Sequence, residues 1–493
     1  MYRVLRRCRP TFWHVMGWCL TGWCLLGASP AATARADALD EYIRAAMQQA
    51  QIPGASVLIR QDGKVVKMGG YGLANVEHGV AATADTVYQS GSLGKQFTAA
   101  GVLLLAAEGR LSLDDRLVRF FPDAPAAWHR ISVRQLLTHT SGLRDYEQEF
   151  DLRRDYTEAE YLAVVKTIPL DFEPGTQYSY SNTGYLLLGL LVSKLSGRHW
   201  SEFLQDRLFA PLGMKSTRVI SERDIVMHRA AGYELDAQPR LRNQDWVSPT
   251  TNSTGDGALY FSVRDLAAWD AALDARQFMP AALFQAWWTP ATLANGTTYP
   301  YGFGWRLGEQ RGFPLVAHGG SWQGFRSAIH RYPAQRLSIV VLTNLASAEP
   351  EQMAQTLAGL IDPALRLPTA GKAVPDPSPE RTARLREVLG AYAEYRRVPG
   401  MARALADTAS GSAREAAGRS RLREQLAAAA SMRFVAADDL GARAIDMFGE
   451  RVARILYYVL DANPGSRGGA DDQPPLLRFH LDAQDRVVAF DEL

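Results

Sequence analysis

Cysteine is nearly absent from this sequence of 493 residues. The three cysteines, Cys8, Cys19 and Cys24, all lie close to the N-terminus. The rest of the chain therefore has no thiol for a disulfide, for a nucleophile or for cysteine-ligated zinc. The nine histidines are scattered and none belongs to an H-E-x-x-H motif, so a metallohydrolase is not indicated. No metal or other cofactor is expected.

The sequence also lacks a large excess of either positive or negative charge. The formal net charge of the whole chain is +2 at pH 7, and charged residues make up 22% of it. The first 36 residues hold five arginines and no acid, so the chain without them carries −3. A near-neutral protein of this kind gives no reason to expect a nucleic-acid partner.

The first 36 residues have the pattern of an export signal. Four arginines precede the apolar run WHVMGWCLTGWCLLGA, and Ala34-Arg35-Ala36 has the small-x-small pattern of a cleavage site. A membrane anchor is the alternative, although the apolar run is short and contains His14. Lipid attachment at Cys24 is disfavoured because Trp23 precedes it. We expect a periplasmic or secreted protein without a stable membrane span after cleavage, and retention of the signal stays open.

Residues 37–365 mix helices and strands in an α+β order. Helical spacing predicts helices over 37–51, 96–111 and 184–198, with the chain turning at Pro53-Gly54 after the first. Asp62-Gly63 between two β-rich runs predicts a hairpin, and a second strand pair is expected around the turn Pro333-Ala334-Gln335. Strands at both ends indicate an antiparallel sheet whose first and last strands are neighbours, flanked by helices and with a helical region inserted.

One stretch in this region, YQSGSLGKQFTA, holds the S-x-x-K spacing Ser92 to Lys95. On a first helical turn, residues three apart share a face, so the lysine comes within reach of the serine hydroxyl. A neighbouring amine can take the serine's proton, and the helix N-terminus favours an oxyanion. The alternative is a helix-capping serine followed by a surface lysine. The chain has only seven lysines and no other S-x-x-K. Gly91 and Gly94 are expected to leave room for substrate and for a tyrosine.

Two further motifs each occur once. Tyr180-Ser181-Asn182 stands immediately before the predicted helix at 184–198, and His318-Gly319-Gly320 leads into the late strands. Taken singly, the first is typical of a helix cap with a packed tyrosine, and the second of a glycine turn with a hydrogen-bonded histidine.

Together the three motifs resemble the serine β-lactamase and penicillin-binding-protein superfamily, in the branch of class C β-lactamases, D-alanyl-D-alanine carboxypeptidases, D-aminopeptidases and β-lactamase-fold esterases. The resemblance covers residues 37–365 and includes the order S-x-x-K, Y-x-N, H/K-x-G and the flanks LLTHTSGL and GFGW. It implies the β-lactamase/transpeptidase-like fold for this region. The residues themselves predict that 1–36 are a signal peptide and that 366–382, rich in proline and polar residues, are a linker. Residues 383–493 resemble the small, mostly β accessory domain that follows this catalytic domain in many exported members, with a lipocalin-like fold as one interpretation.

The resemblance also implies a role for each motif residue. Ser92 is the acylated nucleophile, and Tyr180 is the general base and later the acid. Lys95 either accepts the serine's proton or makes Tyr180 a stronger acid, since a phenol titrates near pH 10 unaided. Asn182 holds Lys95 and the substrate amide. The backbone N–H groups of Ser92 and Ser321 form the oxyanion hole.

The third motif departs from the β-lactamases, which carry Lys-Thr-Gly there. His318, with Gly320 two residues later, offers a weaker anchor for a substrate carboxylate than a lysine would. We therefore expect an esterase or D-amino-acid peptidase, acting on a small ester or amide or on a peptidoglycan-derived peptide, rather than a true β-lactamase. An α/β-hydrolase is disfavoured because residues 319–323 miss the G-x-S-x-G motif. A non-catalytic scaffold that keeps the fold is the remaining alternative.

Overall fold

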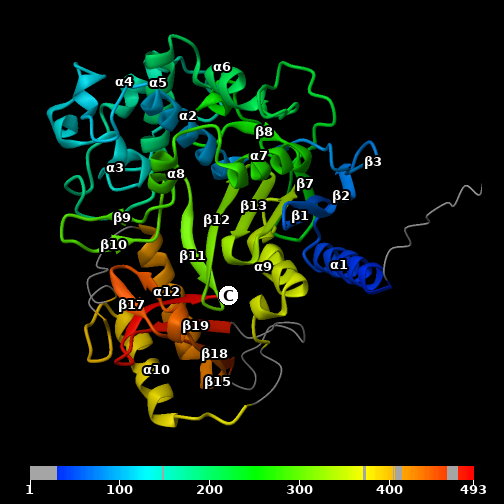
Figure 1. Cartoon of the computed structure of the whole chain (residues 1–493), viewed down its shortest axis with the longest axis vertical. Helices are drawn as coiled ribbons and strands as arrows, with labels where there is room; N and C mark the ends of the chain where they lie inside the picture. Colours follow the sequence, from blue (N-terminus) through cyan, green and yellow to red (C-terminus); the bar gives the residue numbers. More distant parts are fainter. Residues whose placement is uncertain (1–29, 147–148, 370–373, 403–404, 406–412, 463–475) are drawn as a thin grey trace, which may run out of the picture.

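A large antiparallel sheet occupies the middle of the molecule, with helices on both of its faces and a second, smaller sheet below it (Figure 1). The structure is a computed structural model, and it describes residues 30–146, 149–369, 374–402, 405, 413–462 and 476–493. Most of the predicted signal peptide lies outside the described residues. Within those ranges, every helix is too short or too polar to span a lipid bilayer.

The large sheet has seven strands, and neighbouring strands run antiparallel. Their spatial order is β11 (Arg306–Gln310), β12 (Phe313–Trp322), β13 (Phe325–Tyr332), β14 (Leu337–Thr343), β1 (Gly54–Gln61), β2 (Lys64–Asn75) and β3 (Val80–Ala81). The first strand in sequence pairs with the last of this region, with Ala55 opposite Thr343. The prediction that these strands are neighbours, and with it the α+β fold class, is confirmed.

Local sequence explains the two predicted hairpins. Asp62 and Gly63 connect β1 to β2 with φ angles of +52° and +75°. Two successive left-handed residues form the tight turn that follows the twist of paired strands, and Asp-Gly is well suited to it. A 3-10 turn at Pro333–Gln335 connects β13 to β14. Both hairpins are where the sequence places them.

One face of the sheet is covered by helices α1 (Pro30–Gln49) and α9 (Pro350–Ile361). Leu39, Ile43 and Met47 recur every fourth residue along α1 and are buried, as an amphipathic helix requires. Alternate residues of β14, among them Ile339 and Val341, contribute to the same hydrophobic cluster. Helix α1 confirms the helix predicted over 37–51, although it begins at Pro30.

The other face of the sheet carries the inserted helical region. Helices α2 (Lys95–Ala107) and α5 (Asn182–Ser196) contact each other within the largest hydrophobic cluster, and α7 (Val263–Ala275) packs on β1, β2 and β14. Each of the first two ends as the sequence predicts, near Gly109 at φ +71° and at Gly197 at φ +74°. Glycine adopts this left-handed conformation without a clash, which ends a helix. The starts of α2 and α5 carry the first two motifs.

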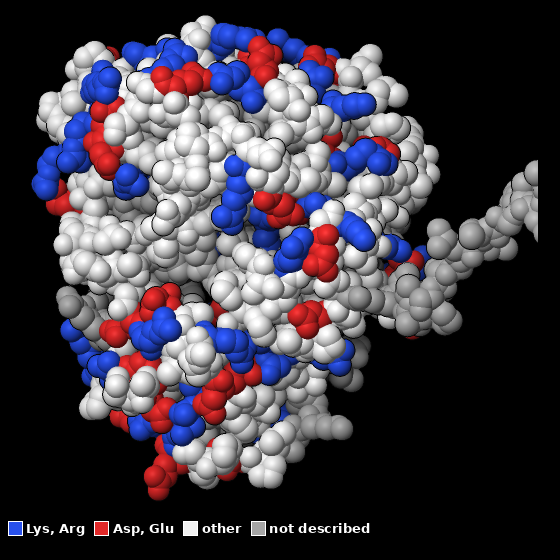
Figure 2. All heavy atoms as spheres, viewed as in Figure 1, with Lys and Arg blue, Asp and Glu red and all other residues white. Residues whose placement is uncertain are grey.

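Shorter elements complete the region. They are α3 (Val133–Leu137), α4 (Glu158–Val165), α6 (Trp200–Leu204), α8 (Ala281–Trp287), a small sheet of β4 (Tyr88–Gln89), β8 (Leu259–Phe261) and β5 (Arg218–Val219), and the hairpins β6 (Tyr233–Leu235) with β7 (Leu241–Asn243) and β9 (Ala291–Thr292) with β10 (Thr298–Tyr299). Acidic and basic side chains are interspersed over the face drawn in Figure 2, and the least charged area lies over α8, β9 and β10.

The C-terminal residues form a four-stranded antiparallel sheet with two helices. The strand order is β15 (Ala429–Asp439), β18 (Arg454–Ala462), β19 (Leu476–Leu481) and β20 (Val487–Glu492), the helices are α10 (Pro379–Ala393) and α12 (Ala413–Ala428), and a hairpin of β16 (Ile445–Met447) and β17 (Glu450–Val452) is separate. Of the predicted linker 366–382, residues 366–369 and 374–378 have no helix or strand, whereas 379–382 already belong to α10. The domain boundaries and the lipocalin-like fold stay predictions.

Charged pairs connect this C-terminal region to strand β11. Glu309 is fully buried and pairs with Arg478 and His480 of β19, the latter with Nε2 at 2.9 Å from Oε1. Next to β11, Arg311 pairs with Asp438 of β15. These contacts explain why the smaller sheet lies against one end of the larger sheet in Figure 1.

Candidate active site

Ser92 and Lys95 lie at the start of α2. Ser92 belongs to the 3-10 helix η1 (Gly91–Gly94), which leads directly into α2, and Lys95 is the first residue of α2. Nζ of Lys95 lies 3.1 Å from Oγ of Ser92. Lys95 is completely buried and Ser92 is partly exposed. The alternative interpretation, a capping serine followed by a surface lysine, is therefore wrong.

Three oxygen atoms surround the Lys95 amine. Besides Oγ of Ser92, Nζ donates to Oδ1 of Asn182 and to the backbone carbonyl of Asp256, both at 2.6 Å. An ammonium has three N–H donors and no acceptor, so these three oxygens match its charged form. Asn182 is the first residue of α5. The Y-x-N motif therefore reaches the S-x-x-K motif as the sequence predicts.

Tyr180 faces Lys95 from the segment that leads into α5. Nζ of Lys95 lies 4.9 Å from the centroid of the Tyr180 ring. The Tyr180 hydroxyl is buried and has no hydrogen-bond partner among the described residues. A buried hydroxyl usually finds a partner, so an unpartnered one at a candidate site is available to a reacting group. This geometry suits the predicted role of Tyr180 as an acid and base.

Two carboxylates and a tyrosine complete a ring of contacts around Lys95. Nδ2 of Asn182 donates to Asp145 at 3.0 Å, and the adjacent residue Tyr146 donates its hydroxyl to the Asp256 carboxylate at 2.5 Å. Burial first, and then the Asp256 charge, raise the pKa of Tyr146 well above its usual value, so it remains a donor. These hydrogen bonds fix the two residues, Asn182 and Asp256, whose oxygens accept from Lys95. The sequence motifs gave no indication of Asp145, Tyr146 or Asp256.

Strand β12 runs directly against η1. A Cβ atom on Gly320 would lie 2.0 Å from the carbonyl oxygen of Ser90, and one on Gly91 would lie 2.5 Å from the backbone nitrogen of Ser321. Gly91 also has φ of +51°, a conformation that favours glycine. The expected use of Gly91 and Gly94 was wrong, because Gly91 faces Ser321 and Gly94 faces Gly257. This approach brings the backbone of Ser321 to η1, where the oxyanion hole is predicted.

Comparison with known proteins shows the family of this chain. The family model described as Beta-lactamase matches residues 39–362, which is more than half of the chain. This chain belongs to the beta-lactamase family. The predicted resemblance and fold class are confirmed, and the family is one of serine hydrolases.

Curated relatives of this beta-lactamase family member include peptidases. Penicillin-binding protein 4* of Bacillus subtilis (strain 168) is 31% identical over 59% of this chain and 67% of its own length. The D-aminopeptidase of Gluconobacter oxydans (strain 621H) is 31% identical over 63% of this chain and 59% of its own length, and that of Brucella anthropi is 31% identical over 64% and 60%. The chain thus spans about three-fifths of the length of these D-aminopeptidases.

Solved structures share the fold. The octameric penicillin-binding protein homologue from Pyrococcus abyssi aligns over 91% of this chain and 96% of its own, with a TM-score of 0.60 and 24% identity. The D-amino acid amidase from Ochrobactrum anthropi SV3 complexed with L-phenylalanine aligns over 67% of this chain and 98% of its own, with a TM-score of 0.58 and 24% identity.

His318, in the third family motif, is part of a buried hydrogen-bond chain. The Ser181 backbone N–H donates to Nδ1 of His139 at 3.1 Å, so His139 carries its proton on Nε2, which lies 3.2 Å from the Tyr301 hydroxyl. That hydroxyl is 2.9 Å from Nε2 of His318, whose Nδ1 lies 2.6 Å from the Gly319 carbonyl. A carbonyl only accepts, so His318 is protonated on Nδ1 and accepts from Tyr301. Both imidazoles are neutral in this arrangement.

The surroundings keep these two histidines neutral. Burial first, and then the charge of Arg306, lower the pKa of His318 well below its usual 6.5. Burial and then the Lys95 charge do the same to the pKa of His139. His318 is only 1% exposed and both of its ring nitrogens have partners. The His318 side chain therefore connects β12 to Tyr301, which fits support of the site, and its weak anchoring of a substrate carboxylate stays a prediction.

Candidate metal ligands are not gathered at this site. Among the residues that the structure describes, no group of three or more histidines, cysteines and carboxylates is arranged to hold a metal ion. The carboxylates nearest Lys95 are instead hydrogen-bonded to Asn182 and Tyr146.

Proposed function

We propose that this protein hydrolyses amide and ester bonds through an acyl-enzyme on Ser92, with D-amino-acid amides and short D-peptides as its substrate class. The observation that carries the proposal is the position of Lys95, whose Nζ is hydrogen-bonded to both Ser92 Oγ and Asn182 Oδ1. The partner-free hydroxyl of Tyr180 lies beside the same lysine. The candidate nucleophile Ser92 and the candidate base Tyr180 thus both lie beside the Lys95 amine.

The proposed reaction follows from the available donors and acceptors. Because Lys95 already donates to three oxygens, Tyr180 rather than Lys95 takes the Ser92 proton. Oγ of Ser92 then bonds to the substrate carbonyl carbon, and the backbone N–H groups of Ser92 and Ser321 hold the oxyanion. The bond from that carbon to the leaving nitrogen or oxygen breaks as Tyr180 returns the proton to it. Water then attacks the ester on Ser92 by the same route and releases the acid.

Charge next to the site supports substrates with a free amino group. The Asp145 carboxylate lies next to Asn182, and the Asp256 carboxylate accepts from Tyr146 while the backbone carbonyl of the same residue accepts from Lys95, whereas His318 is buried and neutral. The guanidinium of Arg306 is paired with Glu351 at 3.5 Å. A substrate ammonium is therefore better matched than a carboxylate. Two of the curated relatives are D-aminopeptidases, which supports the same class. The chain also lacks the Lys-Thr-Gly of true β-lactamases.

A substrate panel tests the proposal. We expect the p-nitroanilide of D-alanine to be cleaved faster than its N-acetylated form and faster than the L-alanine compound. p-Nitrophenyl acetate should be hydrolysed, nitrocefin and an N-acylated peptide that ends in D-alanyl-D-alanine only slowly, and Ser92→Ala should abolish every activity. Turnover that survives in Ser92→Ala would overturn the mechanism. No turnover together with no fluorophosphonate adduct on the wild type would instead support the scaffold alternative.

We also propose that the protein is exported to the periplasm or secreted. The basic start, the apolar run and Ala34-Arg35-Ala36 support this. Cleavage after Ala36 would shorten α1 but keep Leu39, Ile43 and Met47, which are the buried residues in the part of the helix from Asp37 onward. The intact mass of the protein recovered from its native host tests the proposal. A mature chain that begins at Asp37 is expected, and a cytoplasmic protein that keeps Met1 would contradict it.

A further inference from the structure

The tip of the β16–β17 hairpin in the C-terminal region touches the β9–β10 hairpin of the catalytic region. The Phe448 ring lies 5.2 Å from the Tyr299 ring, centroid to centroid, and meets it edge to face at 78°. A Cβ atom on Gly449 would lie 3.4 Å from the backbone nitrogen of Thr298. The hairpin tip is therefore in contact with both the side chain and the backbone of β10.

Tyr299 in turn contacts Tyr178, which belongs to the segment that holds Tyr180. Its ring is stacked on that of Tyr178, with centroids 3.6 Å apart and an angle of 9° between planes. Tyr178 lies two residues before Tyr180 and contacts the His139 ring at 6.0 Å. The His139 ring is 4.2 Å from that of Tyr180. Aromatic contacts are thus continuous from Phe448 to the proposed base.

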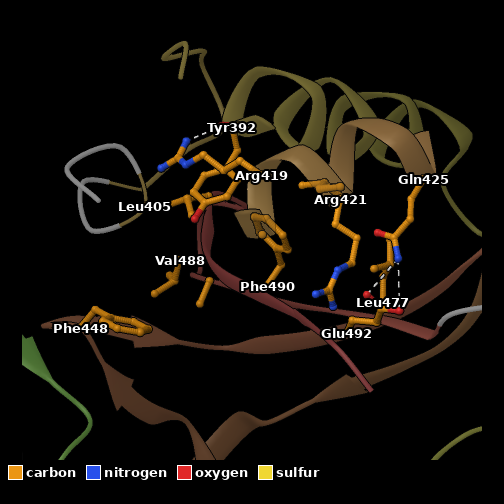
Figure 3. Close-up of a pocket in the computed structure, with 13 residues that line it drawn as sticks. Tyr392, Leu405, Arg419, Arg421, Gln425, Phe448, Leu477, Val488, Phe490 and Glu492 are labelled. Carbon is orange, nitrogen blue, oxygen red and sulfur yellow. Dashed lines mark hydrogen bonds between the residues drawn. The ribbon is translucent and has the colours of Figure 1, made fainter. Parts of the chain in front are cut away.

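The backbone of Phe448 is held in an uncommon conformation. Its φ is +54°, in the left-handed region that residues with a side chain rarely adopt, and Gly449 follows at +80°. Such a residue persists where contacts on several sides fix it. Phe448 also lines a cavity of about 330 Å³ with Phe490 and Val488. Figure 3 shows Phe448 at the end of the cavity nearest the green ribbon.

We propose that Phe448 is a positioning residue for catalysis, which acts through Tyr299 and Tyr178 to hold Tyr180 beside Lys95. This inference rests on the proposed function, because it assigns to the C-terminal region a role in the same acyl transfer. The Tyr180 hydroxyl has no hydrogen-bond partner among the described residues to hold it, so the position of its ring depends on its neighbours. Those neighbours include the rings of His139, Tyr301 and His318 and the Lys95 amine. Small displacements of a catalytic group reduce turnover strongly.

Phe448→Ala tests the inference, with Phe490→Ala as its matched control. Both side chains line the cavity of Figure 3, but Phe490 packs on Tyr392 and Phe479 within the C-terminal region. We expect Phe448→Ala to lower kcat on the p-nitroanilide of D-alanine about tenfold with KM changed less than twofold. The acidic limb of its kcat–pH profile should move to higher pH. Phe490→Ala should keep kcat within twofold, whatever its effect on melting temperature.

Tyr299→Ala removes the same contact from the catalytic side, so the test does not depend on the C-terminal region staying folded. We expect kcat to fall by the same factor in Tyr299→Ala and in the double variant Tyr299→Ala/Phe448→Ala. Both substitutions break the same contact between Phe448 and Tyr299, so their effects should not add. Phe448→Tyr should restore wild-type kcat. Equal kcat loss in Phe448→Ala and Phe490→Ala, or additive losses in the double variant, would overturn the inference. A wild type without turnover would instead contradict the proposed function itself.

Discussion

The Tyr180 ring centroid lies 4.9 Å from the amine of Lys95, and the buried Tyr180 hydroxyl has no hydrogen-bond partner in the described chain. A desolvated hydroxyl without a partner costs stability, so a purely structural residue at this position would be better as phenylalanine. The arrangement has a use if the hydroxyl meets its partner during the reaction.

Tyr180→Phe should therefore separate stability from activity. We expect kcat to fall by a factor of about 10² to 10⁴, the usual contribution of a general acid or base. The free energy of unfolding should stay the same or rise by roughly 1 kcal/mol, because an unpaired polar atom is removed. Tyr185→Phe is the matched control, since its hydroxyl donates to the Leu137 carbonyl at 2.9 Å. That variant should lose about 1 kcal/mol and keep its turnover, and the opposite pattern would contradict the roles of these two tyrosines.

Asp145 should matter for turnover through Asn182. Its carboxylate accepts from Nδ2 of Asn182 at 3.0 Å, and Asn182 in turn accepts from Lys95. Asp145→Ala frees that amide to rotate, so we expect kcat to fall about tenfold or more with the fold kept. Asp171→Ala is the control, because Asp171 pairs with Arg144, the residue before Asp145, and its side chain is 41% exposed. Steady-state kinetics with circular dichroism would decide, and equal effects of the two variants would argue against the ring of contacts.

Stability should fall as the pH drops below about 6.5. The pKa values of His318 and His139 are lowered well below 6.5, for both by burial first and then by nearby charges. The unfolded chain therefore binds protons that the fold excludes, and the stability present above pH 6.5 is lost toward lower pH. Each histidine should cost about 1.4 kcal/mol for each pH unit below that point. Urea unfolding at pH 8.0 and 5.5 would measure this loss.

His318→Gln supplies the control for that pH dependence. A glutamine can still accept a hydrogen bond from Tyr301 but does not titrate, so the variant should lose less stability than the wild type between pH 8.0 and 5.5. An equal loss in both proteins would show that His318 is not excluded from protonation in the folded state.

Glu309 should stabilise the contact between the C-terminal region and β11. Burial raises its pKa, but Arg478 and His480 outweigh this and lower the pKa to about 2 from a usual 4.5. Its stabilising contribution is thus complete above pH 4.5 and is lost as the pH falls toward 2. Glu309→Gln removes a negative charge that pairs with the buried Arg478. We therefore expect the free energy of unfolding to fall by about 3–5 kcal/mol at neutral pH.

Limited proteolysis and thermal unfolding would measure that effect. The variant should expose the C-terminal region to protease and should lose the steep part of the acid titration below pH 4.5. Glu173→Gln breaks a pair that is 67% exposed on the Glu173 side and should change little. A melting temperature of Glu309→Gln equal to that of the wild type would contradict the account.

The sequence predicts the fold where local signals and patterns agree. The Asp62-Gly63 turn, the glycine at the end of α5 and the pairing of β1 with β14 all follow from turn chemistry and hydrophobic spacing. The three motifs also identify Ser92, Lys95, Tyr180 and Asn182, which the structure brings together. Such residues carry their chemistry in their identity and spacing.

The supporting residues could not be found in the same way. Asp145 and Asp256 act through contacts between distant segments, and neither belongs to a repeated pattern. His139 and Tyr301 stand within or next to the flanks LLTHTSGL and GFGW, yet nothing in those flanks shows that they join His318. For His318 the sequence left substrate binding and support open, because an H-x-G motif does not reveal whether the imidazole faces substrate or the interior.

Mass mapping of a trapped acyl-enzyme tests the central claim most directly. The wild type would be mixed with p-nitrophenyl acetate or a fluorophosphonate, quenched in acid and digested, with Ser92→Ala treated in parallel. We predict one stoichiometric adduct on Ser92 in the wild type and none at any position in Ser92→Ala. An adduct on another residue, or the same labelling in both proteins, would contradict the account.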